Sequence, residues 1–253
     1  MTSGGPRPGA VRSVLLLAAG LLAGCGGAVA SVVSPARPTP VQAIAYAHAV
    51  NLRASDLPGF TSIGNEGEEP KPGRYSLEYS RCLGSVSPAR RIAMISSPEF
   101  SAGRGFYGKI IKSTVEVWPT PAMVALNNAR SHSAHGRACL VRFLEAVHKK
   151  INRERNGRGQ IGPFTLTIFP NPLPRVSHSF LTKINETRLL RTGAVRAHIY
   201  RDIFGFTTGP IEIGLEAIGF GHPIPARTEK QVLRLLYSRA TTNTIDLRRQ
   251  TSS

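Results

Sequence analysis

The hydrophobic and polar positions of this chain separate an apolar start, a stretch of small residues and a long amphipathic remainder. An unbroken apolar run covers residues 14–22, directly after a start that carries Arg7 and Arg12. Nine residues are too few to cross a bilayer, which takes about 20. A basic start followed by a short apolar core is typical of an export signal, so this pattern predicts a signal peptide.

The residues behind the apolar run indicate where the signal ends. Leu22-Ala23-Gly24-Cys25 resembles the lipobox of bacterial lipoproteins, in which a peptidase cuts before a Cys that has received a diacylglycerol. The resemblance implies a signal peptide over residues 1–24 and a mature protein held at the cell membrane by fatty chains, such as palmitate, on Cys25. An alternative is cleavage after Ala28-Val29-Ala30, which would release a soluble, secreted protein.

Past Cys25, residues 26–40 are mainly Gly, Ala, Ser, Val and Pro with one charge. Such a segment buries little apolar surface, so residues 25–40 are predicted to be a flexible, lipid-attached tether. Amphipathic patterns then fill residues 41–240, predicted to be one extracytoplasmic domain, and residues 241–253 are a polar tail. No later apolar run reaches the roughly 18 residues that a membrane helix needs.

Apolar residues three and four apart predict helices, and alternating apolar residues predict strands. Helices are expected over residues 41–52, 121–130, 138–155 and 228–239, and strands over residues 75–79, 110–117, 164–168, 180–184, 195–203 and 211–215. Residues 82–105 show little regular pattern, and residues 205–210 have the composition of a hairpin turn. The final strands follow one another as a meander. The fold class is therefore predicted to be α+β, an antiparallel sheet with helices packed on it.

The net charge of the chain indicates which classes of partner it favours. The whole chain carries +17, and removing residues 1–24 takes away two cations and no acid, which leaves +15. An excess of this sign favours anionic partners such as lipid headgroups, although it is equally compatible with a solubilising surface. No nucleic-acid partner is expected, because neither stacked aromatic residues nor a groove-reading motif accompanies the charge.

One predicted helix concentrates the cations and is a candidate surface for an anionic leaflet. The alternative interpretation is a solvated helix face. The cations lie within 17 residues and are Arg142, Lys149, Lys150, Arg153, Arg155 and Arg158.

The three cysteines have separate predicted roles. If Cys25 carries lipid, Cys82 and Cys139 remain as a pair in an oxidising compartment, where a disulfide is expected. The alternative is two free buried thiols. A metal role for either is not indicated, because the chain lacks Cys-x-x-Cys spacing.

Candidate catalytic chemistry is sparse. His132-x-x-His135, with Glu145 further along, is a weak metal-site candidate without a defined third ligand. Glu212 and Glu216 share the polar side of a predicted strand and are expected to face solvent. No nucleophile elbow occurs. We therefore predict no cofactor and no enzymatic activity; the alternative is a metal-dependent or hydrolytic envelope enzyme that uses the two histidines.

Several segments together resemble the extracytoplasmic sensor domain of PknH-type actinobacterial kinases and related lipoproteins. They are Cys82-Leu83-Gly84, a strand ending in Val115-Glu116-Val117-Trp118-Pro119, a helix with Ala122 and Ala125, and Arg137-Ala138-Cys139. A looser similarity connects the chain to PsbP- and LpqN-like lipoproteins. The resemblance implies an antiparallel sheet with a ligand cleft, although the family often has two disulfides where this chain allows one. The expected function is binding or sensing of a small amphiphilic or anionic ligand, or of an envelope protein.

Overall fold

A computed structural model of the chain describes residues 37–64, 66–68, 74–103, 108–154, 160–170, 176, 178–190, 192, 194–243 and 245. The helices in this part are α1 (Pro40–Val50), α2 (Arg74–Leu83), α3 (Pro121–Ser131), α4 (Ala134–Glu154) and α5 (Ala226–Thr242), with short 3-10 turns η1 (Ala54–Asp56) and η2 (Pro88–Arg90). The strands are β1 (Thr61–Ile63), β2 (Gly67–Glu68), β3 (Ala93–Ser96), β4 (Glu99–Ala102), β5 (Lys109–Val117), β6 (Gln160–Pro170), β7 (Phe180–Leu189), β8 (Val195–Thr208) and β9 (Ile211–Phe220).

All nine described strands join one antiparallel sheet. Seven follow the order β1-β4-β5-β9-β8-β7-β6, and β3 pairs with both β2 and β5. The meander β6 to β9 is continuous in space, and β5 joins it beside β9. This confirms the predicted α+β class, an antiparallel sheet that carries helices.

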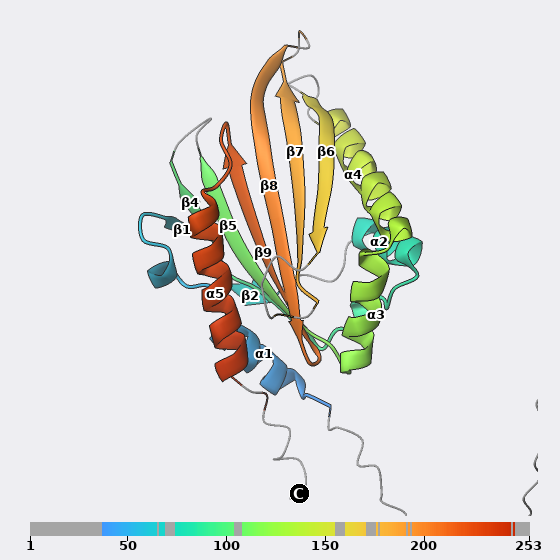
Figure 1. Cartoon of the computed structure of the whole chain (residues 1–253), viewed down its shortest axis with the longest axis vertical. Helices are drawn as coiled ribbons and strands as arrows, with labels where there is room; N and C mark the ends of the chain where they lie inside the picture. Colours follow the sequence, from blue (N-terminus) through green and yellow to red (C-terminus); the bar gives the residue numbers. More distant parts are fainter. Residues whose placement is uncertain are drawn as a thin grey trace, which may run out of the picture. The chain divides into compact units, whose positions relative to one another are not determined.

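The main core lies between the sheet and the helices α1 and α5. Along β9, Ile211, Ile213 and Leu215 alternate with less buried residues and face this core. From α5, the Tyr237 ring packs edge-on against Phe206 of β8, with 5.7 Å between ring centroids. In Figure 1, α1 and α5 accordingly lie together, beside β5 and β9.

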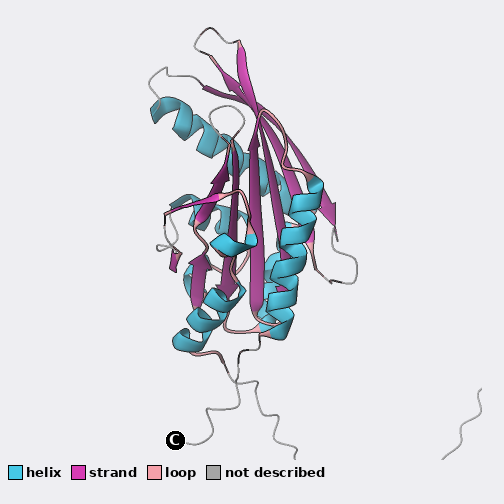
Figure 2. Ribbon diagram, turned by 90° about the vertical axis from the view of Figure 1, so that its left-hand side faces the viewer, coloured by secondary structure: helices cyan, strands magenta, loops and turns pink. Residues whose placement is uncertain are grey.

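Helix α4 covers the other face of the sheet near β6 and β7. Its His148 contacts Glu186 of β7, and Glu186 pairs in register with Ile199 of β8. Successive residues of a strand point to opposite faces of the sheet, so Ile199 points away from the face on which Phe206 meets α5. Glu186 lies on the same face as Ile199, and α4, which contacts Glu186, therefore covers the face opposite α5. Figure 1 shows α2, α3 and α4 grouped on the β6 side, and Figure 2 shows the same layers after a turn of 90°.

A disulfide joins Cys82 at the end of α2 to Cys139 in α4, with the two Cα atoms 5.8 Å apart. Nearby, the rings of Tyr79 and Phe143 approach to 5.4 Å between centroids. The predicted disulfide is thereby confirmed, and it fastens α2 to the helix that covers β6. Among the helices that the structure describes, none combines the length and the apolar character needed to span a bilayer.

Three predictions of local structure are wrong. Residues 75–79 lie in helix α2 and not in a strand, because the helical arrangement brings Tyr79 and Cys82 onto α4. The stretch 82–105 contains η2 and the strands β3 and β4. Both strands pair with β5, which follows this stretch along the chain, and they also pair with β2 and β1. The hairpin turn is shorter than residues 205–210, because β8 continues to Thr208 and only Gly209, with φ of 56°, adopts a left-handed backbone.

Candidate functional site

A groove of about 860 Å³ lies between α4 and the edge strand β6. Val141, His148 and Asn152 line it from the helix, and Phe164 and Leu166 line it from the strand. The helical residues recur at intervals of four and seven, so they share one side of α4. Phe164 and Leu166 are two apart and share one face of β6. Helical and strand periodicity therefore bring two separate rows of side chains onto the same groove.

Two side chains of α4 hold the strand at a set position across the groove. The Asn152 side chain accepts a hydrogen bond from the Ile161 N–H (2.7 Å) and donates one to the Ile161 carbonyl (2.9 Å). Further along, the Arg137 guanidinium donates to the Leu166 carbonyl at 3.2 Å. A register shift between Ile161 and Phe164 separates these two contacts. The groove is thus spanned by hydrogen bonds to the strand backbone at two points.

A buried histidine of the groove lining contacts a buried carboxylate of β7. His148 is 8% exposed, Glu186 is 3% exposed, and His148 Nε2 lies 3.1 Å from Glu186 Oε1. The His148 ring also meets Phe164 edge-on, with 5.2 Å between centroids. Because a carboxylate only accepts hydrogen bonds, Nε2 is the protonated nitrogen of this imidazole.

The surroundings keep Glu186 ionised. Burial by itself would raise the pKa of Glu186, but the hydrogen bond from His148 and the charges of Arg201, His148 and Arg188 outweigh it and lower that pKa below its usual value. Glu186 is therefore ionised at neutral pH, and the neighbouring Arg188 and Arg201 offset its negative charge.

The rim of the groove is mainly cationic. Arg137, Lys149 and Arg153 line it and are exposed, whereas Glu145 is its acidic member. Apolar surface from Val141, Phe164 and Leu166 lies between these charges and the buried pair. Apolar walls with cations at the edge suit a molecule that has an apolar body and an anionic head.

The structure places the cations of the predicted basic surface in different surroundings. Lys149 and Arg153 line the groove. Lys150 lies 3.7 Å from Glu154 on the exposed side of the helix. Arg142 lines a separate cavity of about 170 Å³ beside the disulfide. Arg155 and Arg158 lie outside the described residues, as does Cys25.

The two histidines of the His-x-x-His pattern have different neighbours. His132 packs edge-on against Phe180 at 5.0 Å between centroids, and burial together with the nearby His178 lowers the pKa of His132. His135 Nε2 instead lies 2.7 Å from the Cys82 carbonyl oxygen. Among the residues described, His132 does not belong to any cluster of three metal-binding side chains.

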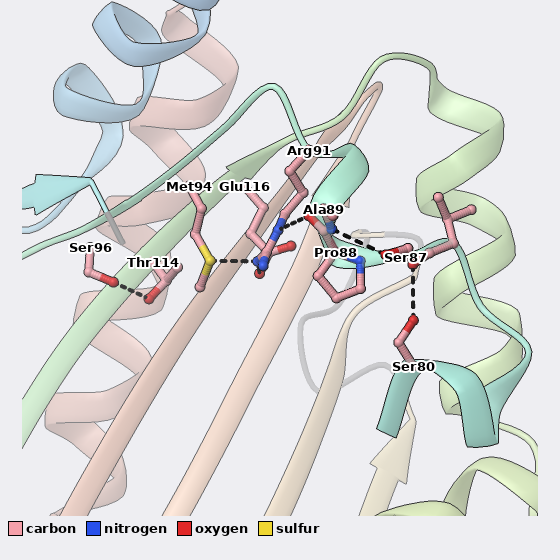
Figure 3. Close-up of polar contacts among 10 residues, drawn as sticks. Ser80, Ser87, Pro88, Ala89, Arg91, Met94, Ser96, Thr114 and Glu116 are labelled. Atoms are coloured by element: carbon pink, nitrogen blue, oxygen red, sulfur yellow. Dashed lines mark hydrogen bonds and ion pairs between the residues drawn. The ribbon is translucent and has the colours of Figure 1, made fainter. Parts of the chain in front are cut away.

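A second polar cluster, which the sequence patterns did not predict, joins Arg91 at the end of η2 to residues of β3, β5 and β9. The Arg91 guanidinium lies 2.6 Å from Glu116 and also contacts Met94, as Figure 3 shows. Glu116 pairs in register with Glu212 of β9, so two carboxyl groups are neighbours across the strands. The positive charge of Arg91 thus lies close to both Glu116 and Glu212.

This cluster corrects the expectation for Glu212. Its burial, together with the charge of Glu116, raises the pKa of Glu212 to about 8. Burial also raises the pKa of Glu116, although Arg91 acts in the opposite direction. Glu216 is half-buried and lies 3.2 Å from Arg201. The predicted pair of solvent-facing carboxylates is therefore wrong for Glu212, whose cross-strand partner is the distant Glu116.

Comparison with family models and with curated proteins finds no match for this chain. Among solved structures, the chain is similar to the extracellular domain of PknH from Mycobacterium tuberculosis, with 11% sequence identity and a TM-score of 0.43. The similarity covers 81% of this chain and 98% of that one. A likeness of this strength establishes neither a shared family nor a shared function, so the relationship to PknH-type sensor domains stays a prediction.

Proposed function

We propose that this protein is a lipid-anchored, extracytoplasmic binding module, and that the groove between α4 and β6 takes a small anionic amphiphile. The observation that carries the proposal is the groove itself, with apolar walls below and cations at its rim. Its volume of about 860 Å³ falls in the range of ordinary small-molecule sites, about 300 to 1,000 Å³.

The distribution of charge favours one orientation of such a ligand. Lys149 and Arg153 are exposed at the rim and attract an anionic head there. The apolar body then lies against Val141, Phe164 and Leu166. A polar ligand without an apolar body would leave these walls unused, and a cationic one would meet the wrong rim.

The proposed location rests on the N-terminal pattern. A basic start, a short apolar core and Leu22-Ala23-Gly24-Cys25 together favour export followed by lipidation of Cys25. Residues 26–40 would then connect the lipid to α1, which begins at Pro40 under a Thr39 cap. A module held close to a membrane encounters anionic amphiphiles at high local concentration, which suits the proposed ligand class.

Lysophosphatidylglycerol is expected to bind at least about tenfold more tightly than lysophosphatidylcholine of the same chain length, because only the former carries a net negative charge. The double variant Lys149→Ala/Arg153→Ala is expected to weaken binding of the anionic lipid about tenfold, since two charge contacts together contribute about 1.4 kcal/mol. Isothermal titration calorimetry below the critical micelle concentrations measures both effects.

A matched control separates the groove from general attraction to a basic helix. Arg142→Ala/Lys150→Ala removes the same charge from α4 without touching the groove lining. Its affinity for lysophosphatidylglycerol is expected to stay within about twofold of the original, since both cations lie away from the groove. Equal weakening by the two double variants, or equal affinity for the two lipids, would contradict the proposed groove.

Cys25→Ala is expected to move the protein from the membrane fraction to the soluble fraction of its host, because the variant has no thiol to receive a diacylglycerol. Fractionation followed by immunoblotting measures the change. Intact-mass spectrometry of the original protein provides the control, with an acylated form beginning at Cys25 expected. Unchanged membrane association of the variant, or a mature form without fatty chains that begins at Ser31, would refute the anchor.

A further inference from the structure

Helices α2 and α4 bring together three side chains that bind metals. His135 and Cys139 lie four residues apart on α4 and so share one side of that helix. Cys82 faces them from the last turn of α2. The two sulfur atoms and one His135 ring nitrogen all lie within 4.8 Å of one another. This group is separate from the groove, whose lining begins on α4 at Arg137 and faces β6.

The distances in this group are close to those of a zinc site. His135 Nε2 lies 3.5 Å from Cys139 Sγ. In a tetrahedral site with Zn–S of about 2.3 Å and Zn–N of about 2.0 Å, neighbouring ligand atoms are about 3.5 to 3.8 Å apart. The His135 nitrogen is therefore already at ligand distance from Cys139 Sγ. To bind a metal it must give up its hydrogen bond to the Cys82 carbonyl oxygen, and the two sulfur atoms must separate once their bond is broken. The Cα–Cα distance of 5.8 Å between the cysteines leaves room for that movement.

We propose that reduction of the Cys82–Cys139 disulfide converts this group into a zinc site with Cys82, Cys139 and His135 as ligands. A dithiol supplies two electrons and two protons to the S–S bond and is itself oxidised to a disulfide. Zn²⁺ then displaces the two thiol protons to solvent, and the imidazole proton moves from Nε2 to Nδ1 as Nε2 binds the metal. Water fills the fourth position.

The surroundings of the two cysteines favour reduction of the disulfide and binding of zinc in its place. Cys139 is 2% exposed, whereas Cys82 is half-buried and His135 is exposed, so a reductant and a metal ion reach the group from the Cys82 side. Arg142 lines the small cavity next to both sulfur atoms. A nearby guanidinium stabilises thiolates, which are the form that binds zinc. The metal would also keep α2 fastened to α4 after the covalent bond is lost.

Zinc stoichiometry in the oxidised and reduced protein tests this proposal. The purified protein is incubated with zinc chloride, with and without tris(2-carboxyethyl)phosphine, then desalted without oxygen and analysed by mass spectrometry for metal. About one zinc ion per chain is expected in the reduced protein and almost none in the oxidised one. With cobalt in place of zinc, absorption from cobalt–thiolate charge transfer and a tetrahedral centre is expected in the reduced protein.

The two histidines give a matched pair of variants. In the reduced protein, His135→Asn is expected to weaken zinc binding at least about tenfold in a competition with a chromogenic chelator, while His132→Asn changes it less than about twofold. Near-ultraviolet circular dichroism monitors folding in each sample. The proposal is overturned by equal affinities of the two variants, by stoichiometric zinc in the oxidised protein, or by a reduced protein that takes up no zinc, whether it stays folded or unfolds.

Discussion

The double variant Cys82→Ser/Cys139→Ser is expected to lower the free energy of unfolding by about 4 kcal/mol. The disulfide joins residues separated by 57 positions, and a cross-link of this length restricts the unfolded chain strongly. The loss is a large fraction of the stability of an ordinary domain, which is about 5 to 15 kcal/mol. Urea unfolding followed by circular dichroism, in the presence of a chelator that excludes zinc, measures the difference.

The structure indicates which part of the fold responds first. Among the described elements, α2 contacts mainly α4 and η2, and the disulfide is its covalent link to α4. In the double variant, amide hydrogen exchange is therefore expected to increase most in α2, while the strands of the meander stay protected. Ser80→Ala serves as a control within α2, since it leaves the cross-link in place. A loss below about 1 kcal/mol in the cysteine variant would show that the cross-link adds little.

Arg91→Met is expected to lower the free energy of unfolding by about 3 kcal/mol at pH 8 and by clearly less at pH 5. The Arg91 and Glu116 side chains are only 11% and 21% exposed, so removing the guanidinium leaves a poorly solvated acid beside Glu212. At lower pH both carboxyl groups take up protons and the repulsion disappears. Urea unfolding at several pH values measures this dependence.

The direction of the pH effect follows from the raised pKa of Glu212. Its ordinary value is 4.5 and its value in the folded protein is about 8. Between these values the folded state binds more protons than the unfolded state, so the contribution of this group to stability is lost as the pH rises from about 4.5 to about 8. Glu212→Gln is expected to flatten the pH dependence of stability in this window.

A matched variant checks that burial causes the effect of Arg91. Arg74→Met also removes a guanidinium that pairs with a glutamate, but Arg74 is 85% exposed and is expected to contribute little. Equal losses in Arg74→Met and Arg91→Met would contradict the argument. A loss in Arg91→Met that is the same at pH 5 and pH 8 would exclude the carboxyl pair as its cause.

Local sequence patterns predict those helices and strands in which buried residues recur at a regular spacing within the element itself. The four strands of the meander, β5 and the helices α1, α3, α4 and α5 all have a run of alternating or helically spaced apolar residues. Helix α2 carries two competing patterns: Tyr75, Leu77 and Tyr79 alternate as in a strand, whereas Tyr75, Tyr79, Cys82 and Leu83 have the spacing of one side of a helix. The helical pattern is the one that places Tyr79 and Cys82 on α4, which begins more than 50 positions further along. The short strands β3 and β4 likewise depend on pairing with β5.

The candidate sites are harder to predict from the sequence than the fold, because their residues come from different helices and strands. The sequence indicated a basic helix, but which of its cations line the groove is decided by the position of β6 along α4. The pairing of Glu116 with Glu212 joins strands that are far apart in the chain. By contrast, the four-residue spacing of His135 and Cys139 is visible in the sequence, and it could have indicated their shared helix face. Only the position of Cys82 opposite them needed the structure.

The contacts that α4 makes with β6 have a consequence for the solution behaviour of the protein. Among the described strands, β6 is the last on its side of the sheet, and the outer backbone groups of such a strand can recruit a strand from a second molecule. Asn152 already occupies both backbone groups of Ile161, and Arg137 occupies the Leu166 carbonyl. Pro163 has no N–H to offer. Two side chains and one proline thereby discourage edge-to-edge aggregation of copies of this protein.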